Sequence, residues 1–90
     1  MKPIYILTLL APTIYARACT QYLLYCGSTL KTIDTGYDSI IRTKLQQRGI
    51  EVTDHSVEDS WWYCLDFGDI NYIDTCEKCV NAGSGNDDHC

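Results

Sequence analysis

The sequence predicts a small α+β domain stapled by disulfides, in which one main helix packs on a short antiparallel sheet. Three observations support this fold class. The chain has 90 residues and six cysteines, which allows one domain at most and approaches the cysteine density of disulfide scaffolds. One segment has the apolar spacing of an amphipathic helix, and two short aromatic segments have the composition of strands.

The predicted helix covers residues 38–48. Ile41 and Leu45 stand four positions apart and so share one face of a helix. Arg48 suits the last turn, and Gly49 suits the left-handed position that follows a helix. Three residues at or before its start are candidates to cap the N-terminus: Asp34, Thr35 and Asp38.

Two strands are predicted at residues 22–26 and 60–65, where aromatic and aliphatic residues cluster. A turn at 27–28 ends the first strand, because glycine and serine are frequent turn residues. Residues 69–76 fit either a short helix or a strand. Residues 81–89 contain two glycines and no apolar residue after the alanine, and they are predicted to form a loop.

The N-terminal residues 1–16 have the pattern of a secretory signal peptide. Lys2 supplies a positive charge, and the apolar run at 4–11 is too short to span a membrane. Cleavage is expected after residue 16, with Ala18 marking the alternative site. The remaining residues, 17–90, form the predicted single domain of a secreted, extracellular protein.

All six cysteines lie in this predicted mature domain, and an oxidising compartment favours disulfides between them. They are Cys19, Cys26, Cys64, Cys76, Cys79 and Cys90. Six cysteines allow fifteen pairings, and the sequence does not choose among them. Cys76 and Cys79 are expected to have different partners, because a disulfide between them would close a strained small ring.

Metal and redox sites are weaker interpretations of the same residues. Cys76 and Cys79 form a Cys-x-x-Cys pair, and His89 and Cys90 would complete a set of four zinc ligands. Adjacent ligands at 89 and 90 make that geometry awkward, and secretion favours oxidised sulfur. Residues 86–88 lack the alternating pattern of a calcium loop. We therefore expect no metal and no cofactor.

Hydrolytic catalysis is a further alternative. A small ribonuclease would need a histidine, a glutamate and an arginine converging on a phosphate, and His55, Glu58 and either Arg42 or Arg48 provide those types. Proximity in sequence does not establish such a geometry. We expect no catalytic residue, and we expect both His55 and His89 to lie in exposed loops.

The candidate partner-binding residues are aromatic. They are Trp61, Trp62, Tyr63 and Phe67. Adjacent residues on a strand point to opposite faces, so one tryptophan can lie in the core while the other is exposed. Exposed aromatic side chains are frequent anchors of protein interfaces. The net charge of −5 disfavours binding to nucleic acid or to an anionic membrane.

Three parts of the chain are distinctive: residues 24–30 (LYCGSTL), residues 83–90 (GSGNDDHC), and a centre containing His55, Cys64 and the Gly-Asp-Ile at 68–70. Together they resemble small secreted cysteine-rich proteins of filamentous fungi, especially plant pathogens. Proteins of this group are treated as candidate effectors, which are released during infection.

The resemblance implies an effector that acts on host proteins or shields the fungus. We expect a monomer that promotes infection by binding a host protein, without catalysis, and entry into host cells is left open. The paired tryptophans and the Glu77-Lys78 dipeptide depart from the commoner pattern of the group. The alternatives are a toxin-like or antimicrobial protein acting on competitor cells, and the small secreted ribonuclease described above.

Overall fold

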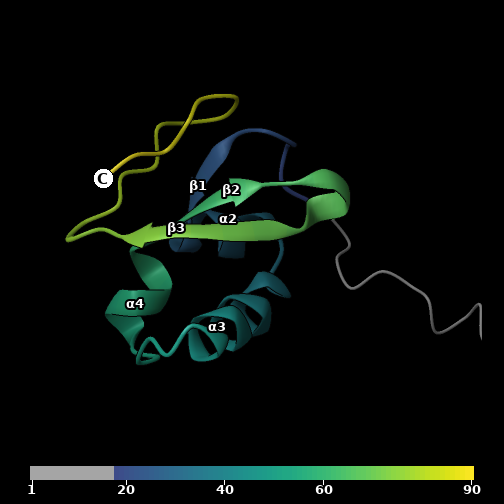
Figure 1. Ribbon diagram of the computed structural model, residues 1–90. Helices are drawn as coiled ribbons and strands as arrows, with labels where there is room; N and C mark the ends of the chain where they lie inside the picture. Colours follow the sequence, from purple (N-terminus) through teal and green to yellow (C-terminus); the bar gives the residue numbers. More distant parts are fainter. Residues whose placement is uncertain (1–17) are drawn as a thin grey trace, which may run out of the picture.

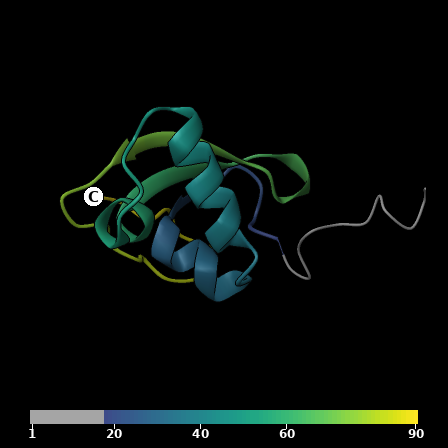
Figure 2. The same cartoon turned by 90° about the horizontal axis from the view of Figure 1, so that it is seen from below.

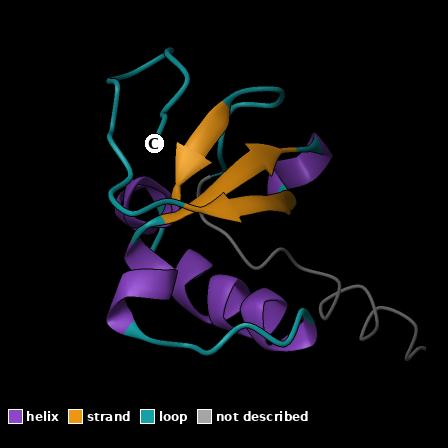
Figure 3. Cartoon of the chain, turned by 60° about the vertical axis from the view of Figure 1, so that its left-hand side comes forward, coloured by secondary structure: helices purple, strands orange, loops and turns teal. Residues whose placement is uncertain are grey.

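Within residues 18–90, which the computed structural model describes, three α-helices lie on one face of a three-stranded antiparallel sheet (Figures 1 and 3). The predicted leader at 1–16 lies outside the described residues. In chain order the elements are β1 (Leu24–Cys26), α2 (Gly27–Ile33), α3 (Tyr37–Gln47), α4 (Asp54–Glu58), β2 (Ser60–Cys64), the 3-10 turn η1 (Asp66–Gly68) and β3 (Ile70–Thr75). This arrangement confirms the predicted α+β class, with α3 as the longest helix.

The sheet has the order β1-β2-β3, so β2 is the central strand. Side chains alternate between its two faces, as the pleat requires. Ser60, Trp62 and Cys64 are completely buried on the helix-facing side, whereas Trp61 and Tyr63 are half-buried on the outer side. Strand β2 therefore divides its aromatic residues between the core and the surface.

The core fills the space between the inner face of the sheet and the helices (Figure 2). The Trp62 ring meets the Tyr72 ring edge-on at 5.4 Å between centroids, an arrangement that aromatic pairs favour. The Trp62 indole N–H donates to Ser60 Oγ at 2.7 Å, so its polar atom is satisfied in the core. The other completely buried apolar side chains from the helices are Leu30, Tyr37, Ile41, Leu45 and Val57.

Helix α3 confirms the predicted helix to within one residue at each end. Gly49 follows it with φ of +74°, the left-handed conformation expected after a helix C-terminus. The predicted N-terminal cap is wrong: Gly36 occupies that position, and no side chain caps the helix. Asp34 instead accepts a hydrogen bond from the Gly36 N–H at 2.7 Å, which shapes the turn before the helix.

Helix α2 stands where the sequence predicted a turn at 27–28. Glycine is required there because α2 begins against another part of the backbone. A Cβ on Gly27 would lie 1.9 Å from the Val57 carbonyl oxygen and 2.7 Å from Ser60 Oγ. The residue that suggested a turn thus permits close packing of α2 on the end of α4.

Helix α4 was also missed, and His55 lies in it, so the prediction of a loop at His55 is wrong. The helix begins with reciprocal hydrogen bonds. The Ser56 N–H donates to Thr53 Oγ1 at 3.0 Å, and the Thr53 N–H donates to Ser56 Oγ at 2.8 Å. This is a capping box in which serine takes the place of the more usual glutamate or glutamine.

The strands occupy the predicted segments, with shorter ends. Strand β1 begins at Leu24, because Tyr22 has a left-handed backbone with φ of 75°. The ambiguous segment at 69–76 forms β3, which pairs with β2. The register of this pairing shifts between Trp61 and Trp62 of β2. The predicted loop at 81–89 is confirmed, and an isolated bridge between Val80 and His89 holds its two ends together.

Three disulfides tie these elements together, and their number is compatible with an extracellular protein. They are Cys19–Cys64, Cys26–Cys79 and Cys76–Cys90. The prediction that Cys76 and Cys79 have different partners is confirmed. The first two close loops with sequence separations of 45 and 53, and loops of this length give each disulfide about 4 kcal/mol in the chain-entropy model.

The C-terminal tail is fastened through Asp88, which is 1% exposed. Its carboxylate accepts hydrogen bonds from the N–H groups of Cys26, at 2.9 Å, and Ala82, at 2.8 Å. Its own N–H donates to the Leu24 carbonyl at 2.9 Å, and its carbonyl accepts from the Trp61 indole at 2.8 Å. Asp88 therefore joins the tail to β1 and β2.

Candidate functional site

The four aromatic residues predicted to bind a partner occupy different environments. Trp62 is completely buried, so its prediction as a contact residue is wrong. It is the tryptophan that faces the helices, as strand alternation allows. Trp61 lies on the outer face and is half-buried, and its indole N–H is used to hold the tail at Asp88.

The remaining two residues, Tyr63 and Phe67, lie at the end of the sheet where β2 passes into η1. Tyr63 is half-buried, and Phe67 is 95% exposed. Tyr22, which is 65% exposed, stacks on Tyr63 with ring centroids 6.3 Å apart. We call Tyr22, Tyr63 and Phe67 the aromatic end. In Figure 1 the η1 turn lies at the opposite end of the β2–β3 hairpin from the chain that leads into the tail.

Two members of the aromatic end have a strained backbone. The φ angles are 75° at Tyr22 and 58° at Phe67, and no other non-glycine residue in the described part of the chain has a positive φ. A bulky side chain in this region is unusual, and it costs on the order of 1–3 kcal/mol. Both strained residues are aromatic and leave most of their surface exposed, and Phe67 gains almost no burial within the domain to offset that cost.

The frame behind the aromatic end is rigid. The Cys19–Cys64 disulfide joins the segment before Tyr22 to the end of β2. The Tyr37 hydroxyl, which is buried, donates to the Gly68 carbonyl at 2.6 Å and thereby fixes η1 from the core. These contacts hold Phe67 on a turn whose neighbours are tied to both the sheet and a helix.

Polar contacts add to this frame and give it an acidic border. Gln21 donates to Asp66 Oδ1 at 3.3 Å, and Asp69 forms an ion pair with Lys44 at 3.5 Å. Asp66 and Asp69 flank Phe67 and remain exposed to solvent. Two acidic residues therefore border the exposed ring, and Lys44 pairs with one of them.

Sequence reasoning missed Tyr22, because it was assigned to the inside of a predicted strand. Its Tyr-Leu-Leu-Tyr context reads as a strand, and nothing in the sequence marks the left-handed turn. One tertiary and one local hydrogen bond set the turn: the Tyr22 N–H donates to the Cys64 carbonyl at 2.8 Å, and the Leu23 N–H donates to the nearby Thr20 carbonyl at 3.2 Å.

The groups that could have formed a ribonuclease site have separate partners. His55 contacts Asp59 at 2.9 Å. Glu58 accepts a hydrogen bond from Lys31, and this contact is the main cause of a raised pKa at Lys31. The last candidates are arginines: Arg42 pairs with Asp38 at 3.0 Å, and Arg48 lies over the Tyr72 ring at 5.1 Å.

The cysteine and aspartate groups considered for metals are also engaged. Cys76, Cys79 and Cys90 are in disulfides. The Asp87 carboxylate accepts from the Leu24 N–H at 3.0 Å. Within residues 18–90, no three side chains of the metal-binding types gather at one point. No helix in the same range is long and apolar enough to cross a membrane.

Comparisons with protein-family models, with curated proteins and with solved structures returned no match to this chain.

Proposed function

We propose that this protein is a secreted interaction protein of the effector type, which binds a host protein through the aromatic end and performs no catalysis. The observation that carries the proposal is the pairing of exposure with strain at Tyr22 and Phe67. A polar residue or glycine at either position would relieve the backbone strain and the exposed apolar area. An aromatic side chain is favourable at these positions only when a partner covers it.

The rigid frame favours this function. Binding by a side chain on a fixed turn loses little conformational entropy, so more of the contact energy appears as affinity. Phe67 has the geometry of an anchor that enters a pocket, and Tyr22 and Tyr63 form a stacked platform beside it. Such clustered aromatic anchors dominate the energetics of many interfaces.

Charge narrows the class of partner. Asp66 and Asp69 border Phe67, and the whole chain carries a net charge of −5. Complementary charges accelerate association and suppress unsuitable partners. The expected partner is a host protein with an apolar pocket and a basic rim.

The test begins with a photoreactive phenylalanine analogue at position 67, which crosslinks the partner in an extract of host tissue. The affinity of the identified partner is then measured for the unmodified protein and for Phe67→Asn. Asparagine tolerates a left-handed backbone, so this variant keeps the turn. We expect its affinity to fall by about 30-fold or more, as for a hot-spot residue.

Ile73→Asn is the matched control, because Ile73 is also an exposed apolar residue, at 41%, but lies outside the aromatic end. We expect it to change the affinity by less than about threefold, as for a residue outside a hot spot. Equal losses in the two variants, or no crosslinked partner, would contradict the proposal.

A further inference from the structure

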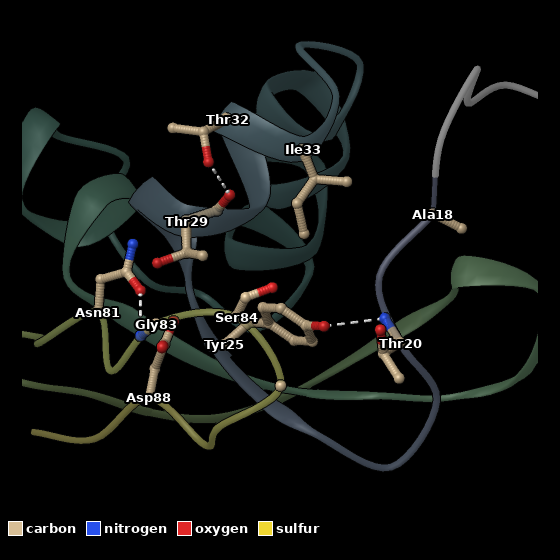
Figure 4. Close-up of a pocket in the computed structure, with 11 residues that line it drawn as sticks. Ala18, Thr20, Tyr25, Thr29, Thr32, Ile33, Asn81, Gly83, Ser84 and Asp88 are labelled. Atoms are coloured by element: carbon tan, nitrogen blue, oxygen red, sulfur yellow. Dashed lines mark hydrogen bonds between the residues drawn. The ribbon is translucent and has the colours of Figure 1, made fainter.

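A pocket of about 460 Å³ lies between the C-terminal loop and helix α2 (Figure 4). One wall is formed by Thr29, Thr32 and Ile33 from α2, and another by loop residues that include Asn81 and Ser84. The volume is within the usual range for a small-molecule site. The pocket includes no residue of the aromatic end, so its role is separate from the proposed protein contact.

Among the described residues, the pocket lining offers no free charge with which to select an ion. Within residues 18–90, Asp88 is the only acidic or basic side chain that lines the pocket. Its two carboxylate oxygens are occupied by the N–H groups of Cys26 and Ala82, at 2.9 and 2.8 Å. A charged ligand would lose hydration without gaining an opposite charge. The pocket therefore suits a neutral ligand.

The lining groups offer a mixture of hydrogen-bond donors and acceptors. The Tyr25 hydroxyl accepts from the Thr20 N–H at 2.9 Å and keeps its own proton to donate. Asn81 uses its oxygen to accept from the Gly83 N–H at 2.9 Å, which leaves its amide hydrogens available. Thr32 donates its proton to the Thr29 carbonyl at 2.6 Å and keeps lone pairs as acceptors.

Thr29 provides an independent sign of a missing contact. Its Oγ1 is buried beneath the loop and has no hydrogen-bond partner among the described residues. A buried hydroxyl without a partner carries a desolvation cost. Threonine in a helix populates two χ1 rotamers, so rotation about this bond can present the hydroxyl to a group inside the pocket.

We propose that this pocket binds a neutral saccharide. Each sugar hydroxyl is both a donor and an acceptor, which matches the mixed lining, and the C–H face of a sugar ring suits the Tyr25 ring and the Ile33 side chain. A phosphate carries negative charge and mostly acceptor oxygens, and an ammonium group carries positive charge and only donors, so neither matches an uncharged lining in which donors and acceptors are present together.

The test uses the full, oxidised protein labelled with nitrogen-15, and glucose, mannose and cellobiose are the probes. We expect at least one of these sugars to shift the amide signals of residues 25–33 and 81–88 in a saturable manner. Inorganic phosphate and protonated glucosamine serve as charged comparisons and should bind more weakly. Tighter binding of a charged probe, shifts centred on Trp61 instead of the pocket, or no saturable shift with any of the three sugars would overturn the proposal.

Two variants assign the binding to the pocket. Thr29→Val removes the unpartnered hydroxyl, so we expect an unchanged or higher melting temperature together with about three- to tenfold weaker sugar binding, the usual effect of one neutral hydrogen bond. Thr43→Val, on the exposed surface of α3, is the matched control and should leave sugar binding unchanged.

Ser84→Ala, in the exposed loop, provides a second weakening variant that does not alter the helix. Unchanged sugar affinity in both Thr29→Val and Ser84→Ala would overturn the assignment. Phe67→Asn should bind sugar normally, which separates this proposal from the protein contact.

Discussion

The strongest prediction concerns Asp88, because its buried carboxylate fastens the C-terminal loop to β1. Substitution by asparagine preserves the size of the side chain and changes only its hydrogen bonding. The amide has one oxygen, so in either orientation its NH₂ group faces one of the two N–H donors, that of Cys26 or that of Ala82. Asp88→Asn therefore converts one hydrogen bond into a contact between two donors.

The expected cost follows from these contacts. A hydrogen bond to a charged group contributes about 1.5–3 kcal/mol, and the remaining bond weakens when its acceptor becomes neutral. Together these losses destabilise the fold by about 3 kcal/mol. The whole domain is expected to have an unfolding free energy of about 4–11 kcal/mol, from the usual stability per residue. The loss would lower the melting temperature by about 12–24 °C.

Urea unfolding followed by tryptophan fluorescence measures this loss, since Trp62 is buried and Trp61 contacts Asp88. Asp87→Asn is the matched control. Its side chain is exposed, and the oxygen that accepts from the Leu24 N–H can be kept while the NH₂ group faces solvent. We expect the control to change stability by less than about 0.5 kcal/mol. Similar unfolding midpoints for the two variants would refute the role assigned to Asp88.

Two further predictions concern the packing of the helices. Gly27→Ala should destabilise the fold by more than about 2 kcal/mol, because its Cβ would meet the Val57 carbonyl at 1.9 Å. Gly49→Ala is the control: it is strained only by its left-handed backbone and should cost about 1 kcal/mol. Equal urea midpoints for the two variants would contradict the close packing at Gly27. The pKa of Lys31 is raised above 10.5 by its hydrogen bond to Glu58. The stability that this pair contributes to the fold is therefore complete below pH 10.5 and is lost as pH rises through the folded-state pKa. Lys31→Gln should therefore reduce the loss of stability above pH 10.5, and an unchanged pH profile would argue against the pair.

The parts of the fold that could be predicted from sequence are those that local pattern determines. Helix α3 has two apolar residues at helical spacing and a glycine after its end, and it was predicted to within one residue. Helix α2 was missed because Gly27 has the composition of a turn, whereas its actual role is close approach to Val57. That role depends on a residue 30 positions away in the chain, which no local pattern can indicate.

The candidate site was predicted in part for a similar reason. Strand alternation indicated that one of Trp61 and Trp62 can face the core while the other is exposed, and the burial of the side chains shows that the core residue is Trp62. The strained backbone at Tyr22 depends on a contact between the N-terminal segment and the end of β2, the hydrogen bond from the Tyr22 N–H to the Cys64 carbonyl. The sequence pattern could therefore nominate Phe67 as an exposed aromatic, but it could not bring Tyr22 beside Tyr63.

The two ends of the sheet are covered differently. The C-terminal tail lies at one end and has little apolar surface to bury. No residue after Ala82 is aliphatic or aromatic, so packing cannot hold this segment, and the Cys76–Cys90 disulfide and the Asp88 hydrogen bonds hold it instead. These contacts fasten the tail beside Trp61. None of the tail contacts described above reaches Tyr22, Tyr63 or Phe67. A segment fixed by polar groups and a disulfide thus occupies the Trp61 side of the outer face, and the aromatic end stays exposed.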